Sequence, residues 1–331
     1  MKKVETADFL QSEAPCLDIR SPGEYNKAHV PGAISFPLFT DSERELVGTN
    51  YKEDGQKAAI KLGLEIVGPK MKRFIEQAEM LKSGTFRMYC WRGGMRSSSM
   101  AWLFEQYGFE VIQLKGGYKS YRHALFALLE QPLKLKVLTG YTGSGKTEVL
   151  HEMQKLGAQV VDLEGLANHP GSSFGNVLEL KQPSTEMFQN LILSEISSFD
   201  LDRPIWIEDE SICIGKVHLP EKLYYKMRES PRYLMKVPIE RRIELLVRQY
   251  GGIGKSRLRK AVEGIQKKLG SERAEEATDA IEKSELAYAA KILLTYYDRQ
   301  YEKSIKEAVK IEVGSLSMVN AADLIIKNYG S

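Results

Sequence analysis

The stretch LKVLTGYTGSGKTEVL, Leu135–Leu150, decides the fold of the second half of this chain. Its pattern predicts a short apolar strand, a glycine-rich turn and the first turns of a helix. It also fits G-x-x-x-x-G-K-[ST] at every fixed position. We call this turn the phosphate loop, and its candidate contacts are Gly140, Gly143, Ser144, Gly145, Lys146 and Thr147.

The chemistry of phosphate explains this spacing. Glycines let backbone N–H groups approach an anion without a clash from Cβ, and the following helix directs the positive end of its dipole to the same place. Lys146 adds a mobile positive charge for a terminal phosphate, and the hydroxyl of Thr147 is positioned to hold Mg²⁺ if that ion is present. The loop predicts a phosphate compound without saying which one.

Length and composition limit the class of protein. The chain has 331 residues, enough for two domains with separate cores. No segment approaches the ~20 apolar residues that cross a bilayer, and the N-terminus lacks the apolar region of a signal peptide. Three cysteines without a C-x-x-C pair argue against a disulfide framework and a zinc site, so a reducing cytoplasm is expected. A net charge of +3 permits a polyanionic partner but does not demand one.

A second chemical stretch is FRMYCWRGGMRSSSMAWLFEQYGF, Phe86–Phe109. It predicts a strand that ends at Cys90, a tight Gly-Gly loop and an amphipathic helix. Backbone N–H groups and the helix dipole stabilise a thiolate at such a position, and Arg92 and Arg96 add positive charge. We therefore predict that Cys90 is a nucleophile. The other two cysteines, Cys16 and Cys213, lie in or just after apolar runs and are expected in the core.

Other features of the first half are expected to be structural. Asp18 and Arg20 end a strand and should hold a neighbouring loop through hydrogen bonds, and His29 precedes a Pro-Gly turn that it should help to pack. Apolar residues recur at helical spacing over residues 58–64 and 71–81, which predicts one or two helices.

Polar residues follow two further strands of the second half. Asp162, Glu164, Asn168 and His169 come after the strand that ends near Val161, and such loops carry the ligand contacts of α/β proteins. The strand in RPIWIEDES ends in Glu208, Asp209 and Glu210, the place of a carboxylate that acts through Mg²⁺. The sequence leaves open which acid acts. Thr147 and Asp209 are our candidate Mg²⁺ ligands, with Glu208 a further candidate of the site.

A basic helical segment, about residues 239–305, follows. Two consecutive helices rich in arginine and lysine could follow a phosphate backbone, although a run of charges is usually a solvated face. The candidate contacts to nucleic acid are Arg241, Arg242, Arg248, Lys255, Arg257 and Arg259.

These patterns resemble known families. LDIRSPGEYNKAHVPGA, followed by a strand, Cys90, a loop with Arg96, a helix and LKGGY, is similar to the rhodanese domain, whose loop cysteine carries sulfur or selenium. Along nearly its whole length the chain resembles the bacterial tRNA 2-selenouridine synthases, a rhodanese domain fused to a P-loop domain. The stretches that carry this resemblance are VGTNYK (47–52), CWRGGMRS (90–97), GYTGSGKT (140–147), DLEGLANH (162–169), GSSFG (171–175), QPS (182–184) and IEDES (207–211).

The resemblance implies a fold and an activity. The expected fold is α/β, with a rhodanese-like domain over residues 1–131 and a P-loop NTPase-like domain over 132–331, built on a parallel sheet with a basic helical part. The implied reaction replaces the 2-sulfur of wobble 2-thiouridine in tRNA with selenium from selenophosphate, after geranylation of that sulfur by geranyl diphosphate. Two positions depart from the family pattern, namely Pro170 where arginine is expected and Ile212-Cys213 where basic residues are expected.

Two other function classes remain open. In one, the phosphate loop binds ATP, and the chain is an ATP-dependent sulfurtransferase or a small-molecule kinase with a sulfur-relay domain. In the other, the rhodanese-like half is a regulatory or docking module on an NTPase. Replacement of Cys90 separates the docking module from both enzymes, and ATP turnover without a polyanionic partner favours the ATP-dependent class.

Overall fold

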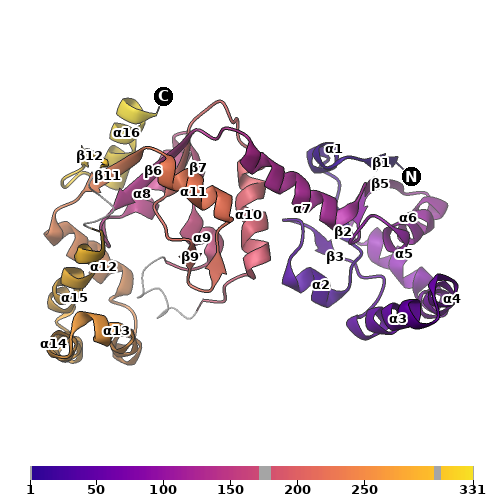
Figure 1. Cartoon of the computed structure of the whole chain (residues 1–331), viewed down its shortest axis with the longest axis horizontal. Coiled ribbons are helices and arrows are strands. Elements are labelled where there is room, and N and C mark those ends of the chain that lie inside the picture. Colours follow the sequence, from indigo (N-terminus) through magenta and orange to yellow (C-terminus); the bar gives the residue numbers. More distant parts are fainter. Residues whose placement is uncertain (1, 171–179, 302–306, 331) are drawn as a thin grey trace. The chain divides into compact units, whose positions relative to one another are not determined.

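The computed structural model describes residues 2–170, 180–301 and 307–330, and its internal contacts divide the chain into Met1–Glu130 and Gln131–Ser331. Each unit is built on a five-stranded sheet in which every strand pair is parallel (Figure 1). Parallel sheets are covered on both faces, which explains why their central strands read as apolar runs. The expected α/β architecture is confirmed in both units.

The sheet of the first unit has the order β1-β5-β4-β2-β3. Its strands are β1 (Lys2–Val4), β2 (Cys16–Asp18), β3 (Ile34–Ser35), β4 (Thr85–Tyr89) and β5 (Glu110–Leu114). The helices are α1 (Thr6–Gln11), α2 (Pro22–Lys27), α3 (Asp41–Glu53), α4 (Gln56–Val67), α5 (Met71–Glu79), α6 (Met95–Tyr107) and α7 (Gly117–Ala127), with short 3₁₀ turns η1 (Gly68–Lys70) and η2 (Leu128–Glu130).

Helices α4 and α5 contain the two segments predicted from helical spacing, whereas the pattern did not predict α3. Gly48 and polar residues in its middle hide the apolar period of α3. A capping box stabilises its first turn: the Thr40 hydroxyl accepts from the Glu43 N–H at 3.3 Å, and the Glu43 carboxylate accepts from the Thr40 N–H at 2.9 Å.

The sheet of the second unit has the order β12-β11-β6-β8-β7, with a separate antiparallel pair β10-β9. Its strands are β6 (Leu135–Gly140), β7 (Gln159–Val161), β8 (Ile205–Glu208), β9 (Cys213–Ile214), β10 (Val217–His218), β11 (Arg232–Lys236) and β12 (Val309–Glu312). The helices are α8 (Lys146–Lys155), α9 (Leu163–Ala167), α10 (Thr185–Ser197), α11 (Glu221–Glu229), α12 (Ile239–Tyr250), α13 (Lys255–Leu269), α14 (Ser271–Glu282), α15 (Leu286–Tyr301) and α16 (Met318–Tyr329).

Helices α12 to α15 form a helical part of their own at one end of this unit (Figure 1). Leu258, Val262, Ile265 and Ile281 lie in its apolar core, and α16 instead packs on the sheet with α8. In both units the central strand of the sheet, β4 or β6, runs directly into a glycine-containing turn and a helix. In α/β sheets this carboxyl edge is where ligands bind.

Candidate active sites: a cysteine loop and a phosphate loop

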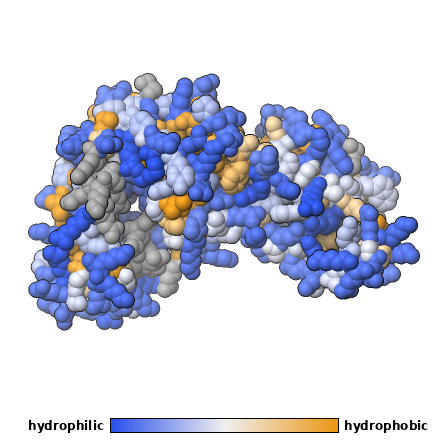
Figure 2. All heavy atoms as spheres, in the orientation of Figure 1, coloured by the Kyte–Doolittle hydropathy of each residue, from blue (hydrophilic) through white to orange (hydrophobic). Residues whose placement is uncertain are grey.

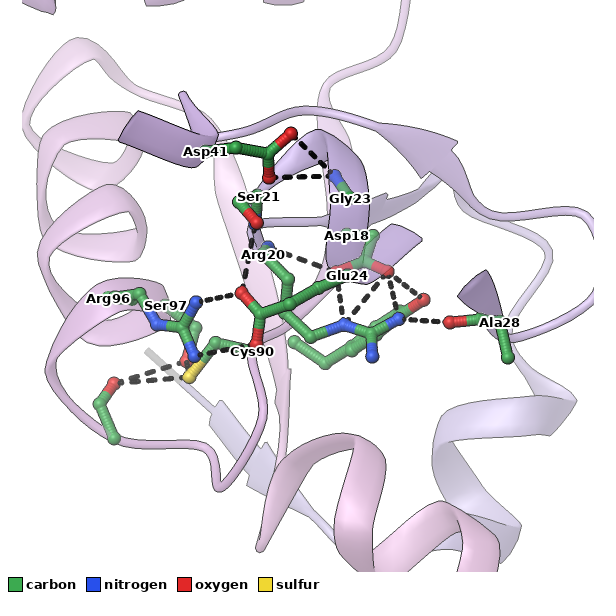
Figure 3. A network of polar contacts seen from close by, with 12 residues as sticks. Asp18, Arg20, Ser21, Gly23, Glu24, Ala28, Asp41, Cys90, Arg96 and Ser97 are labelled. Carbon is green, nitrogen blue, oxygen red and sulfur yellow. Dashed lines mark hydrogen bonds and ion pairs between the residues drawn. The ribbon is translucent and has the colours of Figure 1, made fainter. Parts of the chain in front are cut away.

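Cys90 follows β4 directly, and α6 begins five residues later at Met95. Its side chain is only 2% exposed, and the Ser97 hydroxyl donates a hydrogen bond to its sulfur at 3.2 Å (Figure 3). Ser97 in turn accepts a hydrogen bond from Gln113 Nε2 at 2.6 Å, which leaves the hydroxyl hydrogen for the sulfur or for the Gly94 carbonyl. The buried chain Gln113–Ser97–Cys90 thus supplies a donor to a thiolate.

Glycines hold the loop around Cys90 in place. The Cys90 carbonyl accepts a hydrogen bond from the Tyr118 N–H at 2.9 Å, at the start of α7. A Cβ on Gly117 would lie 2.2 Å from that carbonyl oxygen, and the φ of Gly117 is +62°. Only glycine allows this approach of two backbones. Gly117 of LKGGY therefore lets the start of α7 bind the backbone of the cysteine loop and hold its conformation.

The two loop arginines differ in their surroundings. Arg96 forms an ion pair with Glu24 at 2.6 Å, and Figure 3 shows Glu24 reaching back from α2 to it. Burial alone would raise the pKa of Glu24, but the hydrogen bond and charge of Arg96, with the Ser21 N–H, lower it below its ordinary value. Glu24 therefore stays ionised and fixes Arg96 beside the cysteine. Arg92 is exposed.

Cys90, Arg92 and Arg96 line a cavity of about 580 Å³. Helices α3 and α4 supply its apolar wall, which includes Val47, Tyr51, Ile60, Leu64 and Val67. Arg44 of α3 adds a third arginine, and Gly48 leaves space for it because a Cβ there would lie 2.6 Å from Arg44 Nη1. Sequence reasoning missed this wall, although VGTNYK (47–52) forms part of it.

The other cysteines have different surroundings. Cys16 is buried in β2, as expected. Burial raises its pKa to about 12, opposed by the charge of Arg87, so the thiol is inert. The expectation that Cys213 lies in the core is wrong. It is exposed in the short strand β9, with its sulfur 3.2 Å from His218 Nδ1. Adjacent residues of a strand face opposite sides, so Ile214 is buried while Cys213 faces outward.

The residues expected to be structural in the first unit have that role. Arg20 and Asp18 form a buried ion pair, and Tyr89 donates to the same carboxylate at 2.8 Å. Arg20 also donates to the Ala28 carbonyl, which holds the end of α2. His29 stacks on Tyr25 with a centroid separation of 3.9 Å.

The phosphate loop joins β6 to α8, as predicted. Gly143 and Gly145 have φ of +75° and +76°, the left-handed region that glycine favours. Lys146 lies at the first position of α8, and its Nζ donates to the Gly140 carbonyl at 3.2 Å. The Ser144 hydroxyl is buried and has no hydrogen-bond partner among the described residues. A buried hydroxyl without a partner is costly, which indicates a ligand that it would bind.

Thr147 joins two carboxylates at this loop. Its hydroxyl lies 2.7 Å from Glu208 Oε1 and 3.1 Å from Glu164 Oε2, and Glu208 also accepts from the Glu164 N–H at 2.9 Å. Burial, followed by the charge of Glu164, raises the pKa of Glu208 well above its ordinary value. Among the three acids at the end of β8, Glu208 is thus the one that contacts the Thr147 hydroxyl.

We expected Asp209 to bind Mg²⁺ together with Thr147, but the two arginines beside Asp209 contradict that expectation. Its carboxylate pairs with Arg228 at 2.5 Å and with Arg232 at 3.6 Å. Successive side chains at the end of a strand point to opposite faces, so the carboxylates of Glu208 and Asp209 differ in direction. Glu210 lines the cavity at the phosphate loop, and burial with the charge of Glu164 raises its pKa to about 8.

The phosphate loop opens on a cavity of about 420 Å³. The predicted residues Asp162, Glu164, Asn168 and His169 all line it, as does Pro170. Asp162 caps α9 through the Gly165 N–H and lies 2.7 Å from His151, while the Asn168 amide donates to the Lys181 carbonyl. The predicted loop residues within 171–179, including GSSFG, lie outside the described residues.

The basic helical segment contains one residue that does not belong among the candidate contacts to nucleic acid. Arg242 is 4% exposed and pairs with Asp298 at 2.5 Å, while its Nε donates to the Thr142 carbonyl of the phosphate loop at 2.9 Å. A buried guanidinium held by a carboxylate and a backbone carbonyl does not offer its charge to a phosphate backbone. It instead ties α12 and α15 to the phosphate loop.

The other basic candidates lie on the surface. Arg248, Lys255, Arg257 and Arg259 are exposed and Arg241 is partly exposed, and the surface around α13 and α14 is mostly hydrophilic in Figure 2. Arg259 and Arg241 form ion pairs with Glu282 and Glu244, which lowers the charge that they offer.

The fold and the two loops define a two-domain α/β protein with a rhodanese-like cysteine loop and a P-loop phosphate site. Residues 4–124 match the family model of the rhodanese-like domain, and residues 133–320 match that of the tRNA 2-selenouridine synthase AAA domain. The chain belongs to the tRNA 2-selenouridine synthase family.

Curated relatives bearing that name match over most of their length. The protein of Shewanella frigidimarina is 35% identical over 84% of this chain and 81% of its own. Those of a Sulfurovum species and Bdellovibrio bacteriovorus are each 34% identical, over 91% and 92% of this chain and 92% and 93% of their own. In the part of the chain that the structure describes, no helix is long and apolar enough to span a membrane.

The geometry at Cys90 predicts that Ser97→Ala slows alkylation of Cys90 by iodoacetamide at pH 7 about tenfold. The variant loses a hydrogen bond to the reactive thiolate, worth about 1.5–3 kcal/mol. Mass spectrometry of peptides separates Cys90 from Cys16 and Cys213. Ser99→Ala is the matched control because its side chain is exposed on the same helix. Equal rates for the two variants would show that Ser97 does not act on Cys90.

Glu195 gives a pH-dependent prediction. Burial, followed by the charge of Asp162, raises its pKa from 4.5 to about 7. Between about pH 4.5 and 7 the Glu195 carboxyl is protonated in the folded state and ionised in the unfolded chain. The contribution of this carboxyl to the free energy of unfolding is therefore full below about pH 4.5 and is lost as the pH rises to 7. Glu195→Gln should match wild type at about pH 4 and be more stable at about pH 8, by about 1–2 kcal/mol after allowance for solvent screening.

Urea unfolding at both pH values measures this difference. Replacing the exposed Trp91 and Trp102 with Phe leaves Trp206, in β8, as the fluorescent reporter of the second unit. Glu229→Gln, at an exposed glutamate of α11, is the control and should follow wild type at both pH values. A stability difference for Glu195→Gln that does not change with pH would contradict the raised pKa.

Proposed function

We propose that this protein replaces the 2-sulfur of wobble 2-thiouridine in tRNA with selenium from selenophosphate, by way of an S-geranyl intermediate made from geranyl diphosphate. The observation that carries this proposal is that Cys90 and a phosphate loop occur in one chain of the tRNA 2-selenouridine synthase family. A thiocarbonyl sulfur is a poor leaving group, and alkylation converts it into a good one. Two chemically different sites are then required.

The first step would take place at the phosphate loop. The thiocarbonyl sulfur attacks C1 of geranyl diphosphate, the C1–O bond breaks, pyrophosphate leaves and the base loses its N3 proton. Lys146 and the loop N–H groups would stabilise the charge that develops on pyrophosphate, with no ATP hydrolysis. The unpartnered hydroxyl of Ser144 supports an anion at this position.

The donor set beside the loop fits Mg²⁺. The Thr147 hydroxyl lies within 3.1 Å of one carboxylate oxygen of Glu164 and one of Glu208, and Mg²⁺ is usually held by one or two carboxylates together with substrate phosphates. The described residues form no self-sufficient group of three or more metal-binding side chains. A bound Mg²⁺ would neutralise the diphosphate, and Thr147 with Glu208 would hold it.

The second step would take place at Cys90. The selenium of selenophosphate attacks C2 of the S-geranylated base, the C2–S bond breaks and geranylthiolate leaves. Water then cleaves the P–Se bond, phosphate leaves and 2-selenouridine remains. Cys90 would hold the incoming selenium donor beside the base. The Ser97 hydroxyl donates a hydrogen bond to the Cys90 sulfur. The adjoining cavity combines an apolar wall with Arg44, Arg92 and Arg96, which suits an alkylated base beside a phosphate backbone. Arg241, Arg248, Lys255, Arg257 and Arg259 remain candidates for binding tRNA.

Mass spectrometry of digested tRNA nucleosides tests the proposal. Protein is incubated with 2-thiouridine tRNA, geranyl diphosphate and selenophosphate. Wild type should give geranylated and selenated nucleosides, Cys90→Ala should abolish selenation, and Lys146→Ala should abolish geranylation. Cys16→Ala and Lys155→Ala are matched controls that should behave as wild type. An unchanged nucleoside with wild type under every condition would overturn the proposal in favour of ATP-dependent sulfur transfer.

A further inference from the structure

An apolar cleft adjoins the phosphate-loop cavity. It lies between α12 and α15, and Val247, Leu286, Ala290, Leu293 and Leu294 are among its lining residues. Thr142, Leu246 and Tyr250 line both the cleft and the phosphate cavity, so the two spaces are neighbours. An anion at the phosphate loop therefore has a hydrocarbon-lined space directly beside it.

Contacts of the phosphate loop fix the position of this cleft. A Cβ on Gly143 would lie 2.8 Å from Leu246 Cγ, so the apolar face of α12 packs directly on the loop. Arg242, one turn earlier on α12, holds the Thr142 carbonyl and, through Asp298, also holds α15. The mouth of the cleft is thus set by the same bonds that shape the phosphate site.

The chemistry of the lining selects among phosphate compounds. A nucleobase site needs a few polar groups placed to read the edges of the base. The side chains that line the cleft are aliphatic apart from Thr142, Tyr250 and Tyr297. Such a lining matches a hydrocarbon chain better than a purine.

We propose that this cleft holds the terminal isoprene unit of the prenyl diphosphate donor, and that it sets the chain length of that donor. The inference rests on the proposed function, whose donor it places. The cleft has a volume of about 60 Å³. That is room for about four water-sized groups. The outer five-carbon unit of a ten-carbon chain fills it, while the inner unit lies at the mouth beside Leu246 and Tyr250.

Direct binding measurements test this placement. Isothermal titration calorimetry measures binding of inorganic pyrophosphate, dimethylallyl diphosphate, geranyl diphosphate and ATP to wild type, Ala290→Phe and Ala287→Phe. Ala290 is half-buried in the cleft lining, whereas Ala287 is exposed on the same helix and does not line it. Both variants add the same side chain to α15, so Ala287→Phe controls for its general effects.

Wild type should bind geranyl diphosphate at least about tenfold more tightly than pyrophosphate, because each buried methylene adds affinity. Ala290→Phe should remove that gain and leave pyrophosphate binding within about twofold, which also shows that the fold is intact. Ala287→Phe should resemble wild type. Ala290→Leu is the milder substitution if the larger side chain disturbs folding.

Three results would overturn the inference. They are equal affinity of wild type for geranyl diphosphate and pyrophosphate, equal weakening of both ligands by Ala290→Phe, and loss of ATP binding in Ala290→Phe with no change for geranyl diphosphate. Failure of the proposed function gives a different result. The protein would then bind geranyl diphosphate through the cleft in the titration but would not alkylate tRNA in the nucleoside assay.

Discussion

The tight turn from a central parallel strand into a helix is the constraint on which both sites depend. At Cys90 the turn is closed by a second backbone, since the Tyr118 N–H binds the Cys90 carbonyl and a Cβ on Gly117 would come within 2.2 Å of it. At the phosphate loop the turn is closed by a helix, since Leu246 leaves no room for a Cβ on Gly143. In both units glycine lets a distant segment hold the loop in a reactive shape.

Buried charge determines how each site is held. In the first unit Glu24 fixes Arg96, and the Asp18–Arg20 pair holds the neighbouring end of α2. In the second unit Arg242 links the phosphate loop to α12 and α15, so that the helical part and the loop form one structure. Loss of Asp18 or Asp298 would leave the buried guanidinium of Arg20 or Arg242 without its partner, which is strongly destabilising. These pairs position the groups that meet substrate.

Sequence patterns predicted what is local. Both strand–loop–helix turns follow from short motifs, and the residues of the phosphate loop lie where the motif places them. Long-range partners could not be predicted: Arg242 reads as one more surface arginine until Asp298, far along the chain, is found beside it. The choice of Glu208 over Asp209 required the strand register that alternates their directions. The capping-box spacing of Ser21 and Glu24 was a signal that could have drawn attention to Glu24.

The account assigns alkylation to one loop and selenation to the other, and a bypass experiment tests that division most directly. tRNA that already carries S-geranylated 2-thiouridine is incubated with selenophosphate and either Lys146→Ala or Cys90→Ala protein, and the nucleosides are analysed by mass spectrometry. Binding of the geranylated tRNA by each variant is measured in parallel. The account predicts 2-selenouridine with Lys146→Ala and none with Cys90→Ala. Failure of Lys146→Ala to form 2-selenouridine despite binding the geranylated tRNA would contradict it.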